Sequence, residues 1–299
     1  MRIGASATVF IACYSNVCNP TLFVIMQPLL NLAQRAARAG AEVILRSLGR
    51  LDSLDVASKG RNDFVSEVDR AAEREIIDNI LKLYPDHAFL AEESGASGNP
   101  ASEVRWIIDP LDGTTNFLHG FPTFAVSIAA EVRGRLEAAV VLDVMRQEFF
   151  TASRGAGAQL EGKKIRVSKQ LTLEGALIAT GFPYRADADY LDDYLAMLKG
   201  IMQKAAGVRR PGCASLDLAW LAAGRVDGFW EIGLKAWDTA AGTLLIQEAG
   251  GLVGTLTGAP YTQGGNIIAA PAKLFKEMVQ LIAPLTPASL RETDIGSVI

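Results

Sequence analysis

The first quarter of the chain places its apolar residues at helical spacing. Residues 28–48 repeat small and aliphatic side chains every three or four positions, with Arg and Gln between them, which predicts an amphipathic helix. A second stripe, from Ala72 to Leu83, follows Ser66-Glu67-Val68-Asp69, a segment typical of a helix N-terminus. We therefore expect a long helix from Asp69 to Leu83 that ends before Pro85.

The spacing of the apolar residues is no longer helical beyond residue 85. Residues 88–91 and 105–108 are short apolar runs that lead into acidic residues, which is typical of buried strands with functional groups at their carboxyl ends. Residues 124–132 and 136–144 flank a turn sequence and predict a hairpin, and 148–152 predicts a further strand.

Beyond residue 170 the pattern alternates between helix and strand. We expect helices at 187–203, 214–223 and 237–249 and one starting near Pro271, with strands at 176–180, 226–231, 252–255 and 266–270. Because no repeat or linker interrupts this order, the sequence predicts one compact α/β unit.

The composition narrows the possible functions. Of 299 residues, 49% are hydrophobic, which is enough for a large core and excludes a disordered protein. The net charge of −4, from 29 Lys+Arg and 33 Asp+Glu, leaves no basic excess, so we expect no strong nucleic-acid binding. Two His and three Cys cannot supply a four-ligand zinc site, so any metal chemistry would use carboxylates.

Residues 1–25 form a separate apolar leader with one charged residue, Arg2, and no sustained helical spacing of its apolar residues. Polar residues interrupt it too early for a membrane span, which needs ~20 apolar residues, and Cys13 follows only a poor lipoprotein cleavage box. We interpret the leader as a mis-assigned start, with translation beginning at Met26, or as disordered. A soluble, cytoplasmic protein without membrane contact is expected.

The densest chemical signal is Asp109-Pro110-Leu111-Asp112-Gly113-Thr114-Thr115-Asn116. An apolar strand delivers Asp109, Pro110 is expected to end it, and Asp112 follows closely. Two carboxylates so near each other repel unless a hard cation lies between them, and Mg²⁺ prefers oxygen ligands. The N–H groups after Asp112 would bind an anion.

Two further acidic segments lie at the ends of predicted elements: Glu92-Glu93 follows the strand expected at 88–91, and Asp238 lies at the start of the helix expected at 237–249. Glu92-Glu93 alone is typical of a solvated loop, and Asp238 alone is typical of a helix cap. Together with the Asp109 segment they favour a metal site.

Other catalytic motifs do not fit. Phosphatases that form an aspartyl-phosphate place two acids two residues apart, whereas Asp109 and Asp112 are three apart. There is no dinucleotide fingerprint around Gly155 and no Gly-x-Ser-x-Gly elbow for a serine hydrolase. We interpret Cys213, which has no evident activating partner, as a packing residue.

With these segments in view, the chain resembles the inositol monophosphatase family. The resemblance runs from Met26 to about residue 283 and rests on Trp-Ile-Ile-Asp-Pro-Leu-Asp-Gly-Thr-Thr-Asn-Phe and Trp-Asp-x-Ala-Ala-Gly. It implies the α/β fold of the inositol monophosphatase and fructose-1,6-bisphosphatase type, a layered α-β-α-β-α sandwich. One phosphatase domain would span 26–283, with a metal-binding half at 26–170, an α/β half at 171–283 and a C-terminal tail at 284–299.

The resemblance also implies residue roles. A first Mg²⁺ would be held by Glu92, Asp109 and the Leu111 carbonyl, a second by Asp109, Asp112 and Asp238, and a third ion more weakly by Glu92 through waters. Thr114 and Asp69 would orient and deprotonate the attacking water, with Glu92 also in the catalytic set. The residues implied to contact substrate are Asp112, Gly113, Thr114, Ala214, Glu231 and Asp238, and Lys59 and Asp63 match a mobile loop near the metals.

The implied activity is Mg²⁺-dependent hydrolysis of a phosphorylated polyol, myo-inositol 1-phosphate in first place, without a phosphoenzyme. Relatives that hydrolyse fructose 1,6-bisphosphate, histidinol phosphate, 3′-phosphoadenosine 5′-phosphate or NADP leave the substrate open. The resemblance further implies inhibition by Li⁺, a homodimer, and a second, non-catalytic role with RNA polymerase in ribosomal RNA transcription. Arg209-Arg210 and Lys163-Lys164 are small basic pairs that could serve such a partner.

Overall fold

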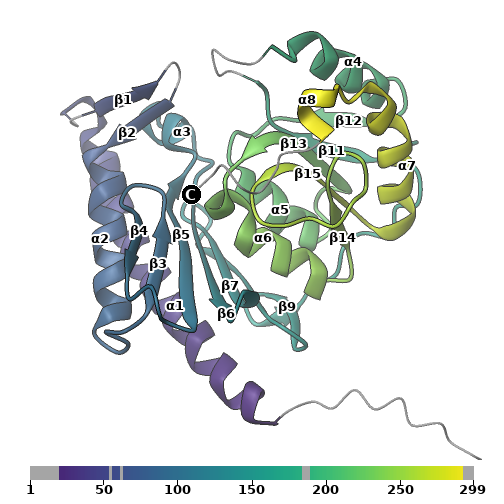
Figure 1. Cartoon of the computed structure of the whole chain (residues 1–299). Coiled ribbons are helices and arrows are strands. Elements are labelled where there is room, and N and C mark those ends of the chain that lie inside the picture. The colour runs from purple at the N-terminus through teal and green to yellow at the C-terminus, as the bar shows by residue number, and fades with distance from the viewer. Residues whose placement is uncertain (1–19, 54–55, 61–62, 184–188, 292–299) are drawn as a thin grey trace, which may run out of the picture.

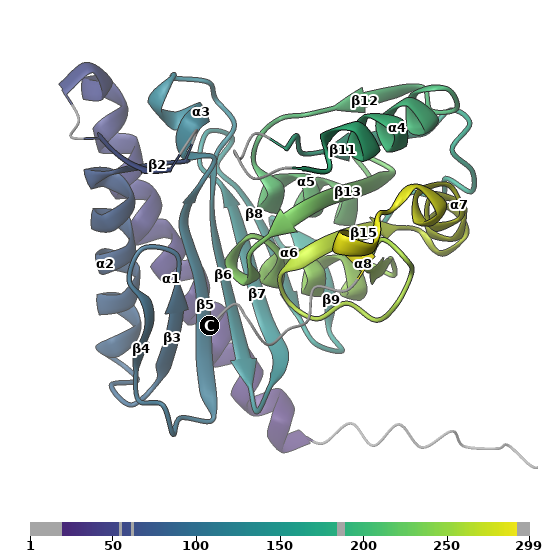
Figure 2. The same ribbon diagram turned by 45° about the horizontal axis from the view of Figure 1, so that its top comes forward.

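The computed structural model describes residues 20–53, 56–60, 63–183 and 189–291, of which 20–27, 52–53, 56–60 and 63–66 are described by their backbone alone. The described elements form an eight-stranded and a five-stranded sheet with helices between and outside them (Figure 1). Seen from a second direction, the helices and sheets stack as successive layers (Figure 2).

Two long helices form the first layer. α1 (Pro20–Ser47) and α2 (Glu67–Leu81) cover one face of the large sheet. Much of the predicted stripe is buried, since Ala36, Ile76 and Ile80 have no exposed surface. Val43 is only half-buried, and Leu83, expected in the second stripe, is 55% exposed and lies beyond the end of α2. A 3₁₀ turn, η1 (Leu48–Ser53), and a hairpin of β1 (Val56–Gly60) and β2 (Asp63–Ser66) connect the two helices.

The large sheet is the second layer, in the order β10-β9-β8-β7-β6-β5-β3-β4. Its neighbours pair antiparallel except β3 with β5, which run parallel and so end at the same edge. The strands are β3 (Ala88–Ala91), β4 (Gly95–Gly98), β5 (Val104–Asp112), β6 (Ala125–Val132), β7 (Arg135–Asp143), β8 (Glu148–Ser153), β9 (Gly157–Leu160) and β10 (Lys163–Lys164), and the short helix α3 (Thr114–Leu118) follows β5.

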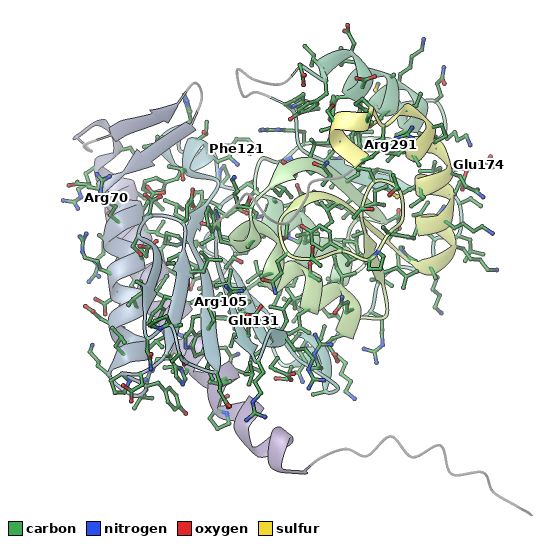
Figure 3. All side chains as sticks on the ribbon, viewed as in Figure 1. Arg70, Arg105, Phe121, Glu131, Glu174 and Arg291 are labelled. Atoms are coloured by element: carbon green, nitrogen blue, oxygen red, sulfur yellow. The ribbon has the colours of Figure 1, made fainter. Side chains whose placement is uncertain are left out.

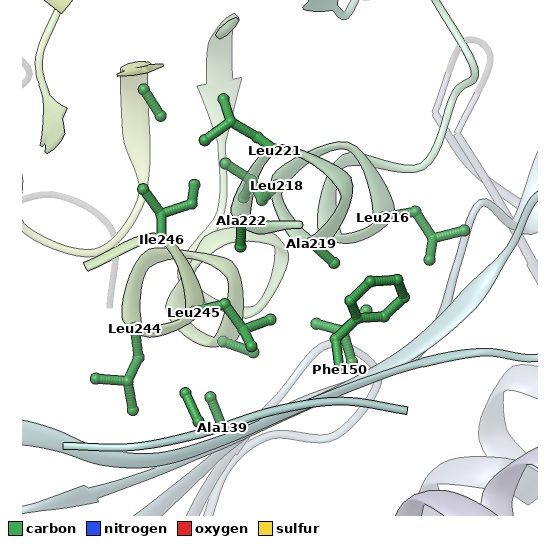
Figure 4. Close-up of a cluster of buried hydrophobic side chains, with 14 of the residues drawn as sticks. Ala139, Phe150, Leu216, Leu218, Ala219, Leu221, Ala222, Leu244, Leu245 and Ile246 are labelled. Carbon is green, nitrogen blue, oxygen red and sulfur yellow. The ribbon is translucent and has the colours of Figure 1, made fainter. Parts of the chain in front are cut away.

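α5 (Ala214–Ala222) and α6 (Ala236–Glu248) form the middle layer, between the two sheets. A helix in this position is buried on all sides, which explains why α5 has no polar face and reads almost continuously apolar. Figure 4 shows Ala219 of α5 and Leu245 of α6 on the side of these helices that faces Phe150 of the large sheet. The helices approach so closely that a Cβ atom at Gly242 would lie 2.4 Å from the Leu218 Cβ.

The five-stranded sheet and its outer helices complete the layers. Its order is β12-β11-β13-β15-β14, from β11 (Leu177–Thr180), β12 (Gly207–Arg209), β13 (Gly228–Leu234), β14 (Leu252–Gly254) and β15 (Gly265–Ala270). α4 (Leu191–Met202) and α7 (Ala272–Ile282) pack on its outer face, followed by η2 (Ala283–Leu285) and α8 (Ala288–Arg291). The expected α-β-α-β-α sandwich is therefore confirmed.

Most predicted elements are present, although several ends differ: α2 ends at Leu81 rather than Leu83, and β13 begins at Gly228 rather than 226. α1 begins at Pro20, so residues 20–25 of the expected leader belong to a helix, and Pro is tolerated in a first helical turn. β5 continues past Pro110 to Asp112, because an irregularity between Asp109 and Asp112 lets the pairing with β6 resume at Ala125. α4 begins at Leu191; the expected start at 187, the leader residues 1–19 and the tail residues 292–299 lie outside the described residues.

Candidate active site

The candidate site lies where β5 ends and α3 begins. Asp109 and Asp112 occupy the irregular end of β5, and Gly113 turns the chain into α3 with φ 93° and ψ 35°. A Cβ atom at Gly113 would lie 2.9 Å from the Thr123 carbonyl oxygen, so both the backbone conformation and the space require glycine. The sequence predicts the close backbone approach at Gly113, and the structure confirms it.

Backbone N–H groups hold one oxygen of each of three aspartates. The Leu111 N–H donates to Asp109 Oδ1 at 3.0 Å. The Ser215 N–H, at the start of α5, donates to Asp112 Oδ2 at 2.7 Å. The Lys235 N–H, before α6, donates to Asp238 Oδ2 at 2.7 Å. Three segments far apart in sequence therefore fix the orientation of these carboxylates.

The same carboxylates repel one another. Burial raises the pKa of Asp109 well above its usual value, and the charges of Glu92, Asp112 and Asp238 raise it further. Burial and the charge of Asp112 raise the pKa of Asp238 in the same direction. Burial also raises the pKa of Asp112, although its hydrogen bonds to Ser215, Cys213 and Gly113 oppose the rise. Such mutual repulsion is costly unless a cation or a proton offsets it.

The donor set fits a hard divalent cation by its chemistry. Four carboxylates converge, and the Leu111 carbonyl adds a neutral oxygen donor; Mg²⁺ binds such oxygens in preference to nitrogen or sulfur. In the part of the chain that the structure describes, no three His, Cys, Asp or Glu side chains already stand in a complete metal-ligand geometry. The fit therefore rests on the kind and proximity of the donors.

The predicted catalytic pair is brought together. The Thr114 hydroxyl donates to Asp69 Oδ1 at 2.8 Å, although α2 supplies Asp69 and the two residues are 45 positions apart. The same hydroxyl lies 3.1 Å from the Leu111 carbonyl oxygen. Asp69 has no exposed surface, so its carboxylate depends on such donors.

Residues that the sequence did not assign to the site hold Asp112 from the α5 side. Cys213 is the N-cap residue of α5, yet its thiol donates to Asp112 Oδ2 at 3.2 Å and lies 3.4 Å from the Asp112 carbonyl oxygen. The interpretation of Cys213 as simple packing was therefore incomplete: it is 1% exposed and also contacts the site. No sequence signal could have shown this, because 101 residues separate the two side chains.

Asn116 joins the two halves of the molecule at the site. Its side-chain amide donates to the Thr123 carbonyl at 2.7 Å and to the Pro211 carbonyl at 2.8 Å. The sequence motif included Asn116 without a role, and the structure gives it one: it ties the turn after β5 to the segment before α5.

The expected substrate residues lie on the α5 side. Ala214 is the first residue of α5 and is almost fully buried. Glu231, on β13, rests against Gly181, where an added Cβ atom would lie 1.8 Å from Glu231 Oε1. Asp217, one turn along α5, has its pKa raised well above the usual value by burial and by the charges of Glu231 and Asp112, which the Arg210 charge opposes. The sequence did not indicate Asp217, and it singled out Arg210 only as part of a basic pair for a macromolecular partner.

The remaining predicted residues lie apart or outside the description. Lys59 and Asp63 belong to β1 and β2, but their side chains lie outside the described residues. His87 accepts a hydrogen bond from the Trp106 indole at 2.9 Å, a structural contact. No helix in the described ranges has the length and apolarity to cross a membrane.

The basic pairs lie on separate strands. Arg209 ends β12, and Lys163 and Lys164 form β10 with exposed side chains. Figure 3 labels another charged pair, Arg105 and Glu131 on β5 and β6, joined by an ion pair of 3.0 Å.

Comparisons with known proteins agree with this geometry. The model of the inositol monophosphatase family matches residues 25–286. The Nus factor SuhB of Pseudomonas aeruginosa is 55% identical over 271 residues, which is 89% of this chain and 100% of the relative. Among solved structures, the extragenic suppressor protein suhB of Bartonella henselae has 42% identity and a TM-score of 0.82, over 85% of this chain and 98% of that one. The inositol monophosphatase of Anabaena has 34% identity and a TM-score of 0.75, and the match covers 89% of this chain and 99% of that one. The chain belongs to the inositol monophosphatase family.

Proposed function

We propose that this chain is a Mg²⁺-dependent phosphatase that hydrolyses a small phosphate monoester, with myo-inositol 1-phosphate as the first candidate substrate. Family membership supports the phosphatase activity. The observation that carries the proposal is the Thr114–Asp69 hydrogen bond at the turn after β5, beside a group of mutually repelling carboxylates supplied by β5, the end of β3 and α6.

The metal ligands in this proposal are oxygen donors. Glu92, Asp109 and the Leu111 carbonyl would hold one Mg²⁺, and Asp109, Asp112 and Asp238 a second, with Glu92 also near a third through water. A pair of divalent ions in such a site neutralises charge on the attacking and leaving oxygens and lowers the pKa of water. No histidine base is needed, which suits a chain with two His.

Thr114 and Asp69 would prepare the attacking water. With its hydrogen directed at Asp69, Thr114 Oγ1 is free to accept a hydrogen bond from water, and the proton of that water can pass toward Asp69. The water oxygen then forms the new bond to phosphorus while the ester oxygen leaves and takes up a proton. Because the aspartates serve as metal ligands, no phosphoenzyme forms.

The turn after β5 would bind the phosphate and the α5 side the polyol. Backbone N–H groups of Gly113 and Thr114 are the phosphate donors in this proposal, and the phosphate would compete with the Asp112 carboxylate for the Gly113 N–H. Hydroxyl groups of the polyol would meet Glu231, Asp238 and the Ala214 backbone.

A substrate panel with Mg²⁺ tests the proposal. Turnover of myo-inositol 1-phosphate should exceed that of fructose 1,6-bisphosphate, histidinol phosphate, 3′-phosphoadenosine 5′-phosphate and NADP, and Asp109→Asn should abolish it. Millimolar Li⁺ should inhibit, as in the family. Better turnover of another substrate would reassign the substrate, and activity retained by Asp109→Asn would overturn the metal site.

The relatives support a second, compatible function. The 55% identical relative carries the name Nus factor, so we infer that this chain also contacts RNA polymerase in the cytoplasm. A pull-down of RNA polymerase should succeed equally with wild type and Asp109→Asn. Partner binding lost together with metal binding would contradict a separable role.

The chain is also proposed to be a homodimer. α4 exposes Leu191, Leu195 and Met202, three apolar side chains that a second copy could cover. Sedimentation should give about twice the 31.9 kDa of one chain, and a single-chain mass would refute this.

A further inference from the structure

Groups at the start of α5 hold one oxygen of the Asp112 carboxylate. Its Oδ2 atom accepts the Ser215 N–H at 2.7 Å and the Cys213 thiol at 3.2 Å, and the Ser215 hydroxyl bonds to the same carboxylate. Carboxylate oxygens have about two lone pairs each. Oδ2 is therefore occupied from the start of α5. The Gly113 N–H also bonds to this carboxylate, so a cation that coordinates Asp112 would bind the other oxygen, Oδ1, beside that donor or in its place.

Asp112 also takes the place of the N-cap side chain of α5. Cys213 occupies the N-cap position, but its side chain makes no capping bond to its own helix. The residue that accepts the orphan Ser215 N–H is Asp112, which comes from β5. Because the Cys213 thiol makes no capping bond, it can donate to Oδ2 of Asp112, and it also lies 3.4 Å from the Asp112 carbonyl oxygen. This arrangement locks the side chain to its own backbone as well as to α5.

We propose that Cys213 is a positioning residue that makes Asp112 a one-oxygen metal ligand. The thiol holds Oδ2 on the α5 side and so presents Oδ1 to the second Mg²⁺ of the site. This inference rests on the proposed function, because it assigns a role toward the metal named there. Donors that orient a ligating carboxylate change metal affinity by about 10–100-fold when they are removed.

A packing role would behave differently. Cys213 is buried among the residues of the central core, so its replacement by alanine also removes packing. Loss of packing lowers the free energy of unfolding but leaves metal affinity unchanged in the molecules that remain folded. Loss of positioning weakens Mg²⁺ binding, and a serine hydroxyl should restore it because it donates the same hydrogen bond.

The test measures Mg²⁺ binding directly, by calorimetry on the full chain of wild type, Cys213→Ala and Cys213→Ser, with unfolding midpoints as a second readout. Ser153→Ala is the matched control, since Ser153 is buried and its hydroxyl has no hydrogen-bond partner in the described structure. We expect Cys213→Ala to weaken Mg²⁺ binding about 10-fold, Cys213→Ser to stay within about threefold of wild type, and Ser153→Ala to bind as wild type.

Each outcome decides the inference. Wild-type affinity in Cys213→Ala, or equal weakening in the alanine and serine variants, overturns it. If Cys213→Ala does not fold, Ser215→Ala removes the hydroxyl donor to the same carboxylate and must weaken binding by more than Ser153→Ala does. Failure of the proposed function would look different, because wild type itself would then bind no Mg²⁺.

Discussion

Replacing Gly181 by alanine should separate substrate binding from folding. Gly181 follows β11, and an added Cβ atom would lie 1.8 Å from Glu231 Oε1, 2.0 Å from its Cδ and 2.6 Å from Oε2. Since carbon and oxygen in contact are roughly 3.3 Å apart, the whole carboxylate must move by about 1.5 Å. The group that moves is the end of a flexible side chain, so the fold should tolerate the change.

The magnitude follows from the proposed role of Glu231. A hydrogen bond from a polyol hydroxyl to a carboxylate contributes about 1.5–3 kcal/mol, and each 1.36 kcal/mol is a factor of ten. Loss of that bond should therefore lower kcat/KM for the polyol phosphate by about 10–100-fold. The urea midpoint should change little, because no backbone atom is displaced.

Steady-state kinetics and urea unfolding of Gly181→Ala provide the measurements. Gly49→Ala is the control, because an added Cβ atom at Gly49 meets nothing within 4 Å. Wild-type kcat/KM in Gly181→Ala would refute the placement of Glu231 in the substrate site. A large loss of stability with unchanged kinetics of the folded fraction would show that the contact is structural.

Three further substitutions probe other parts of the structure. Thr114→Val removes the donor to Asp69 and should lower kcat by about 10²–10⁴-fold, measured at saturating Mg²⁺. His87→Phe removes the acceptor of the Trp106 indole and should destabilise by about 1–3 kcal/mol at pH 8. Burial lowers the pKa of His87. The contribution of His87 to the free energy of unfolding is therefore present above about pH 6.5 and is lost as the pH falls through the lowered pKa. In urea unfolding, the difference in free energy between wild type and His87→Phe should be smaller at pH 5 than at pH 8. In Gly242→Ala the added methyl group clashes with Leu218 between α5 and α6, so urea unfolding should show a free energy of unfolding lower by about 1–3 kcal/mol.

Each of these has a control in the chain. Thr115→Val changes an exposed neighbour of the same type and should leave kcat unchanged. His119→Phe changes an exposed histidine and should leave the free energy of unfolding at pH 8 as in wild type. If Thr114→Val and Thr115→Val lower kcat alike, or if the two histidine variants behave alike, the contacts assigned here are wrong.

The sequence alone predicted most helices and strands because burial leaves a local pattern. α1 and α2 bury one face and show the helical stripe, whereas β5 is covered on both faces and appears as a continuous apolar run. Element ends were less well predicted. Pro110 lacks an N–H and was expected to end its strand, but the irregularity beside it lets β5 continue to Asp112.

The candidate ligands were predicted because the acids occur together at the ends of apolar elements, and the turn at Gly113 because glycine tolerates positive φ. Only the tertiary structure decided how these groups are held. The bonds of Thr114 to Asp69 and of Cys213 to Asp112 cross 45 and 101 residues, and the contact of Gly181 with Glu231 joins the segment after β11 to β13. Local sequence records which residue types are present and which faces are buried. The partner of a buried polar atom depends instead on how the layers pack, and packing brings together segments that no local pattern relates.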